Sequence, residues 1–240
     1  MSKQMMRGQQ QRGAYVAFVL VVSIFGLVIS TALLRNPPSF LAASGYRRAL
    51  IVLAFDFICV AGIFAVLFPV ACSGLLGTRF SGAEMSGRFG IRATRFLGVL
   101  IVHGHHPSGS ESRRHELLFR GRSFCATCYG LLTGAVLSLT IMTAFLVSGW
   151  SGWSSIYPAY FVYYVGVDAV VTGLLQTIVP WAGARAKFVL AFVFVAGTSL
   201  MLLATELLSR NLVADFFVIL LAVFWILSWI SLSHRSQLLK

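Results

Sequence analysis

The segment from residue 103 to residue 130, HGHHPSGSESRRHELLFRGRSFCATCYG, holds the side chains best suited to chemistry. It contains four of the chain's five histidines and two of its four cysteines. Two residues separate Cys125 from Cys128, and a glycine follows two positions later, which is the knuckle pattern of a zinc site. Thiolate and imidazole together favour zinc over magnesium or calcium, with iron as a poorer alternative.

The histidines upstream complete a candidate ligand set. We expect two cysteine and two histidine ligands, drawn from Cys125, Cys128, His105, His106 and His115. His103 is a further candidate at the membrane end of the segment. The spacing is not that of a standard zinc finger, but the number of ligands suits a tetrahedral site. Four protein ligands leave no open coordination position, so the pattern favours a structural metal over a catalytic one.

Other interpretations of the cysteine pair stay open. A helix that begins at Cys125 and Cys128 would stabilise thiolates, so a membrane thiol or metal oxidoreductase is an alternative function. A CxxC pattern can also occur by chance, with no site at all. Covalent haem attachment is excluded because it needs a histidine directly after the second cysteine, where this chain has Tyr129.

The composition is that of an integral membrane protein. The 240 residues are 58% hydrophobic and 11% charged, with a mean hydropathy of +0.85, whereas a soluble domain has about 25% charged residues. The formal net charge is +12, and the basic residues lie mostly between apolar runs, where anionic lipid headgroups attract them. A lipid bilayer is therefore the expected partner, and nucleic acid is not, because no long folded basic segment is present.

Six apolar runs are long enough to cross a bilayer as helices, so the sequence predicts an all-α, polytopic membrane protein. They span about residues 14–34, 49–71, 126–147, 156–179, 188–208 and 213–232. The charged start at residues 1–14 resembles a signal peptide, but the apolar run after it is too long and no cleavage pattern follows. We therefore expect a retained anchor and a single transmembrane domain over residues 1–240.

The distribution of lysine and arginine predicts the orientation. Basic residues are concentrated in the N-terminus, the second and fourth loops and the C-terminal tail. This pattern predicts a protein of the cytoplasmic membrane with both termini in the cytoplasm. Arg47 and Arg48 oppose this rule on the outer side. The long second loop, residues 73–124, is then cytoplasmic, and its residues 90–102 suit an interfacial helix or re-entrant segment.

Three polar side chains are expected within the apolar runs: Asp56, Asp168 and Gln176. An intramembrane carboxyl group is costly and marks a possible functional site. Asp168 has Tyr164 one helical turn before it and Thr172 one turn after it, on one face. This stripe could serve a proton or cation transporter, but an interhelical hydrogen bond is the simpler interpretation.

Other residues of the apolar runs have structural interpretations. Glu206 and Asp215 lie near the ends of the last helical hairpin, where we expect water to solvate them. Cys59 and Cys72 are expected to be small buried apolar residues. Glycines at residues 130–135 and 166–173 permit close helix packing.

The elements HHP, a later histidine and FCATCYGLLTGA together resemble a family of uncharacterised prokaryotic, notably archaeal, multi-pass membrane proteins. Members of that family often have CAGC or CARC where this chain has Cys125 to Cys128. They commonly carry another cysteine after the His-Pro element, where this chain has Ser108, Gly109 and Ser110. The resemblance implies a shared His/Cys site and implies no activity.

Taken together, these patterns predict a six-helix membrane protein whose second loop is pinned to the third span by a metal ion. Paired catalytic carboxylates, nucleotide-binding loops and catalytic triads are missing from the sequence. The chain is therefore expected to be a non-catalytic, accessory subunit that associates with other membrane protein subunits. The thiol oxidoreductase and the Asp168-dependent transporter are the alternatives.

Overall fold

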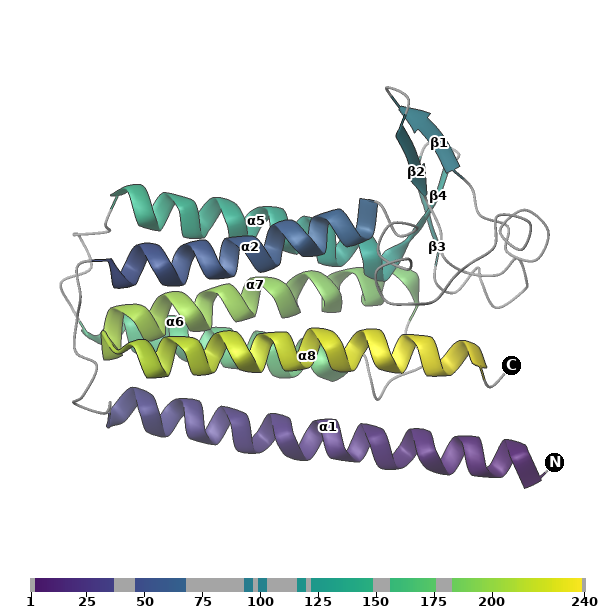
Figure 1. The fold of residues 1–240 in the computed structure, drawn as a ribbon, viewed down its shortest axis with the longest axis horizontal. Coiled ribbons are helices and arrows are strands. Elements are labelled where there is room, and N and C mark those ends of the chain that lie inside the picture. Colours follow the sequence, from purple (N-terminus) through teal and green to yellow (C-terminus); the bar gives the residue numbers. More distant parts are fainter. Residues whose placement is uncertain are drawn as a thin grey trace. The chain divides into compact units, whose positions relative to one another are not determined.

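A computed structural model describes residues 3–36, 46–67, 93–96, 99–102, 116–119, 122–148, 156–175 and 183–238. This part of the chain contains six α-helices and two short antiparallel hairpins (Figure 1). The helices are α1 (Lys3–Arg35), α2 (Arg47–Leu67), α5 (Ala126–Ser148), α6 (Ile156–Leu174), α7 (Ala184–Ser209) and α8 (Leu212–Leu238). The predicted helical membrane fold is confirmed.

Four helices are long and apolar enough to cross a membrane: Gly13–Arg35 of α1, and the whole of α2, α5 and α7. Helix α6 has 19 residues, and Leu212–Ser228 is a shorter apolar stretch of α8. Helices α1 and α8 extend beyond the apolar runs at residues 14–34 and 213–232, because a helix can continue outside the hydrocarbon. The orientation of the termini stays a prediction.

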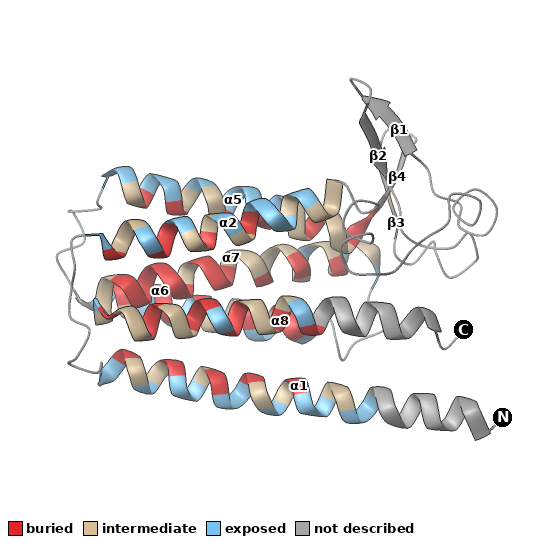
Figure 2. Ribbon diagram, in the orientation of Figure 1, coloured by how far each residue is buried: buried red, intermediate tan, exposed pale blue. Residues whose placement is uncertain are grey.

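Large apolar side chains cover the outer faces of these helices. On α1 and α2 they include Phe18, Ile24, Phe25 and Phe57, each more than half exposed. Exposed residues alternate with buried ones along α1 and α2, whereas buried residues dominate much of α7 (Figure 2). Because such side chains cannot face water without a large cost, these faces contact the lipid bilayer.

The two hairpins correct one prediction. Residues 90–102 were expected to form an interfacial helix or re-entrant segment, but β1 (Ala93–Phe96) pairs with β2 (Val99–Val102) in antiparallel register. Three of the four residues of β2 are valine or isoleucine, and β1 contains Thr94 and Phe96. Such β-branched and aromatic side chains favour strands over helix. The second hairpin pairs β3 (Glu116–Phe119) with β4 (Arg122–Cys125).

The helices divide into two compact units, each described by itself. One unit comprises Met1–Phe55, Phe145–Asp168 and Thr198–Lys240. Here α1 and α8 lie side by side (Figure 1). The buried Trp225 indole N–H donates to Ser23 Oγ at 2.8 Å, and the buried Tyr163 hydroxyl lies 2.9 Å from Ser30 Oγ. These bonds satisfy polar groups that the apolar surroundings would otherwise leave unpaired.

The other unit comprises Asp56–Ala144 and Ala169–Gly197. Within it α5 and α7 pack closely and run parallel, because glycines of α5 meet α7 at successive turns. A Cβ atom on Gly130 would overlap the carbonyl oxygen of Phe188, and one on Gly134 would lie 2.9 Å from Val195 Cβ. Ser138 Oγ also donates to the Val195 carbonyl at 3.3 Å. The expected packing role of the glycine segment is confirmed.

This packing predicts the effect of a methyl group. Replacing Gly130 with alanine should lower the free energy of unfolding by about 1–3 kcal/mol, because the added Cβ atom forces the α5 and α7 backbones apart. Gly62 is a matched control, since an added Cβ meets no atom within 4 Å there. Thermal unfolding of the purified variants in detergent checks this. Equal losses at both glycines would show that helix propensity, not packing, sets the effect.

Candidate functional site

The cysteine pair lies where a strand passes directly into a helix. Cys125 is the last residue of β4, and α5 begins at Ala126. Cys125 is buried and Cys128 is half-buried. The two thiols are within hydrogen-bonding distance of each other, so one turn of chain presents both sulfur atoms to the same point.

This geometry supplies half of the expected zinc site. Two adjacent thiols at a strand-to-helix turn fit a tetrahedral metal, which takes sulfur ligands from one knuckle. The predicted histidine ligands, His105, His106 and His115, and the further candidate His103 lie outside the described residues. Among the residues that the structure does describe, no group of three or more His, Cys, Asp and Glu side chains could hold a metal ion. The four-ligand site therefore stays a prediction.

A buried lysine lies at the start of α7, in the same unit as the thiols, and the sequence did not predict its burial. Lys187 is only 4% exposed. It lies one turn before Ala191, which faces Gly130 of the parallel helix α5. One turn before Gly130 is Ala126, so the backbone of Lys187 is level with the first turn of α5.

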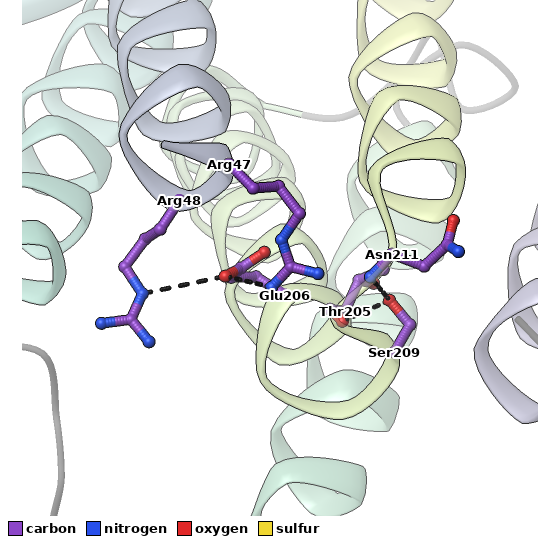
Figure 3. A network of polar contacts seen from close by, with 6 residues as sticks. All are labelled: Arg47, Arg48, Thr205, Glu206, Ser209 and Asn211. Atoms are coloured by element: carbon purple, nitrogen blue, oxygen red, sulfur yellow. Dashed lines mark hydrogen bonds and ion pairs between the residues drawn. The ribbon is translucent and has the colours of Figure 1, made fainter. Parts of the chain in front are cut away.

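A second polar cluster lies in the unit that contains the N-terminal half of α2. The buried Arg47 donates from Nη2 to Glu206 Oε1 at 2.7 Å, and Arg48 Nε lies 3.7 Å from the same oxygen (Figure 3). The side chains of Arg47 and Glu206 are 8% and 3% exposed, whereas that of Arg48 is 41% exposed. The guanidinium of Arg48 also stacks over the Phe145 ring at 4.9 Å. We call Arg47, Arg48, Glu206 and Asp215 the charged cluster.

Asp215 is the most deeply buried member of the charged cluster, with no solvent exposure. Its carboxyl group is within hydrogen-bonding reach of the Glu206 carboxyl group. No N–H or O–H donor of the described residues reaches either oxygen of Asp215 or Oε2 of Glu206, and Arg47 Nη1 has no acceptor there. The prediction that water solvates Glu206 and Asp215 is wrong, because helix packing encloses both carboxyl groups.

A tight junction holds these carboxyl groups together. Only Arg210 and Asn211 separate α7 from α8, and Arg210 adopts a left-handed backbone with φ of 46°. Asn211 Oδ1 accepts from the Val213 N–H at 2.9 Å, which caps the first turn of α8. Ser209 Oγ donates to the Thr205 carbonyl at 2.8 Å (Figure 3). The spacing of Glu206 and Asp215 is therefore set by local geometry.

The predicted intramembrane carboxyl groups have different surroundings. Asp56 accepts a hydrogen bond from Thr143 at 3.3 Å, while its Oδ1 atom is buried without a described partner. Asp168 lies on the exposed side of α6. Gln176, the third predicted polar residue, lies outside the described residues, as does Cys72. Cys59 is buried, as predicted.

The exposed side of α6 carries other polar groups near Asp168. Tyr164, one turn earlier, is exposed and its hydroxyl accepts from Arg35 Nη2 at 3.3 Å. No hydrogen bond or ion pair to Asp168 is present among the described residues. The interhelical hydrogen bond expected for Asp168 is thus not found in that part of the chain.

No protein-family model, curated protein or solved structure matches this chain.

Proposed function

We propose that this integral membrane protein carries a structural zinc site and acts as a non-catalytic, accessory subunit of a larger membrane complex. The observation that carries the proposal is the pair of adjacent thiols at the start of α5. In this proposal Cys125 and Cys128 supply two ligands, and two histidines from His105, His106 and His115 supply the others. Membership in the resembled archaeal family belongs to the same proposal.

The segment that leads to the thiols needs a source of folding energy. Residues 103–115 are rich in glycine and serine and offer little apolar surface to bury, so ordering them costs more than packing returns. Zinc binding supplies such energy, because a ligand set of this kind is formed only in the folded state.

The assembly part of the proposal is supported by Asp168. A carboxyl group near the middle of a membrane helix costs about 2.5–3.5 kcal/mol on the insertion scale. Asp168 is exposed on α6 and has no recorded partner in the described part of the chain. A polar or basic side chain of a neighbouring subunit would remove this cost, as intramembrane charges commonly pair with one another.

Purification of the tagged full chain from its own membrane in mild detergent tests both parts. We expect one zinc ion per chain by elemental analysis, resistance of that zinc to chelators, and other membrane proteins in constant ratio. The Cys125→Ser variant should lose the zinc, whereas the control Cys59→Ser, at a buried cysteine of α2, should keep it.

Two results would redirect the proposal. A chain without metal whose Cys125 and Cys128 cycle between dithiol and disulfide would support the oxidoreductase instead. Zinc in a chain that purifies alone would leave the metal site and exclude the accessory role. Iron in place of zinc would keep the site and change its metal.

A further inference from the structure

The charged cluster contains more carboxyl groups than buried positive charges. Glu206 and Asp215 are both buried, and Arg47 is the one fully enclosed guanidinium beside them. Arg48 is 41% exposed, and its 3.7 Å approach to Glu206 is too long for a hydrogen bond. Two ionised carboxylates here would repel each other and would lack most of their solvation.

Several buried polar atoms of the charged cluster have no hydrogen-bond partner among the described residues. Glu206 Oε2 and both oxygens of Asp215 have no donor among the described residues, although the two carboxyl groups are within hydrogen-bonding reach of each other. Two carboxylates cannot bond to each other, but a carboxylic acid can donate to a carboxylate. Arg47 is independent evidence for a binding site here. It is more than nine-tenths buried, and its Nη1 atom also has no acceptor among the described residues.

We infer that Glu206 and Asp215 form a proton-binding site, in which Asp215 carries the proton and donates it to Glu206 Oε2. The ion pair with Arg47 identifies Glu206 as the ionised partner, since Oε1 already accepts the 2.7 Å bond. The neutral Asp215 then needs no counter-ion at a position with no solvent exposure. One shared proton gives a hydrogen-bond partner to two of the three unpaired carboxyl oxygens, Glu206 Oε2 and one oxygen of Asp215.

Loss of this proton changes the charge of the site by one unit. Asp215 becomes a carboxylate, the proton goes to water, and two negative groups then face Arg47. Arg48 is the one other cation of the charged cluster, and its partial exposure leaves it free to swing inward. Arg210, at the junction, is exposed. Deprotonation is therefore expected to loosen the contact between α2 and the α7–α8 junction.

The sign of the pH dependence follows from proton counting. The folded chain holds a proton that an exposed aspartic acid has already released at neutral pH, so folding stability falls as pH rises toward the point where the site deprotonates. Replacing Asp215 with asparagine removes this proton. The variant should lose the fall in thermal midpoint that the unaltered chain shows as pH rises.

Infrared spectroscopy of the full chain provides the direct test. The chain has only seven acidic residues, and three of them are aspartates: Asp56, Asp168 and Asp215. Protein grown with a heavy isotope at the aspartate side-chain carbonyl should show, at neutral pH, a carboxylic-acid band that shifts with the label. The double variant Asp56→Asn, Asp168→Asn leaves Asp215 as the sole aspartate and does not touch the charged cluster.

We expect that double variant to keep the label-sensitive band. If the double variant lacks the band, the proton belongs to Asp56 or Asp168 and the inference is overturned. Absence of the band from the unaltered chain would also overturn it. A label-sensitive band that persists unchanged in the Asp215→Asn variant would likewise overturn the inference. An ionised Asp215 would show instead that a cation or water fills the site. The outcome is independent of zinc content, so it can fail while the proposed function stands.

Discussion

Replacing Glu206 with alanine is expected to destabilise the protein by about 3–5 kcal/mol, the cost of removing one partner of a buried ion pair. The substitution leaves Arg47 enclosed with no counter-charge, because its side chain is 8% exposed and its 2.7 Å bond to Glu206 is lost. Asp215 could deprotonate to compensate, but it lacks a direct bond to Arg47. Thermal unfolding in detergent, followed by circular dichroism, measures the loss.

A double variant separates charge from packing. Changing Arg47 to methionine together with Glu206 to leucine removes both charges while keeping similar volumes, and such replacements are often neutral or stabilising. We expect the double variant to recover most of the stability that Glu206→Ala loses. If the single variant is as stable as the unaltered chain, Arg47 is not enclosed and the charged cluster is wrongly described. Arg48→Met should cost little, because Arg48 is partly solvated.

Replacing Cys128 with serine is expected to abolish zinc binding and to unfold the segment between β2 and β3. The metal-binding energy is folding energy, and structural zinc contributes about 10–16 kcal/mol in small zinc-binding peptides. Trypsin should then cleave rapidly after Arg113 and Arg114, which lie in that segment. The measurement is the rate of tryptic cleavage with and without chelator.

The control for this experiment is Cys59→Ser, which removes a buried thiol of α2. This control variant should cleave after Arg113 at nearly the rate of the unaltered chain, because it changes only the overall stability and by a small amount. Equal cleavage rates in Cys128→Ser and in the unaltered chain, with unchanged zinc content, would refute the metal site. Because the zinc is expected to resist chelators, chelator should leave cleavage slow in the unaltered chain and should not change the rapid cleavage of Cys128→Ser.

Hydropathy predicted the helices well for a physical reason. A bilayer requires each spanning segment to satisfy its own backbone hydrogen bonds over about 30 Å, so long apolar runs have little choice but to form helices. Outside the hydrocarbon this constraint disappears. Residues 93–102 were therefore misassigned, because a short apolar run with two arginines nearby suits an interfacial helix as well as it suits the β1–β2 hairpin.

The charged cluster could not be predicted from the same information. Hydropathy gives the depth of Glu206 and Asp215 but not the direction in which their side chains face, and the partner of Glu206 is 159 residues away. One signal was present. Arg47 and Arg48 do not fit the predicted distribution of positive charge, and charged side chains within a membrane commonly pair with one another. The buried Lys187 gave no comparable sign, because it sits in a loop-to-helix boundary rich in basic residues.

The length of the two-residue junction between α7 and α8 sets the positions of Glu206 and Asp215 relative to each other. We expect an inserted residue to change the direction in which α8 leaves α7, which would carry Asp215 away from Glu206 while leaving both helices intact. Length changes at Arg210 and Asn211 are thus expected to weaken the inferred proton binding by the carboxyl pair without disturbing membrane insertion. The shortest connection between two helices of the described chain is, for that reason, the one least able to vary in length.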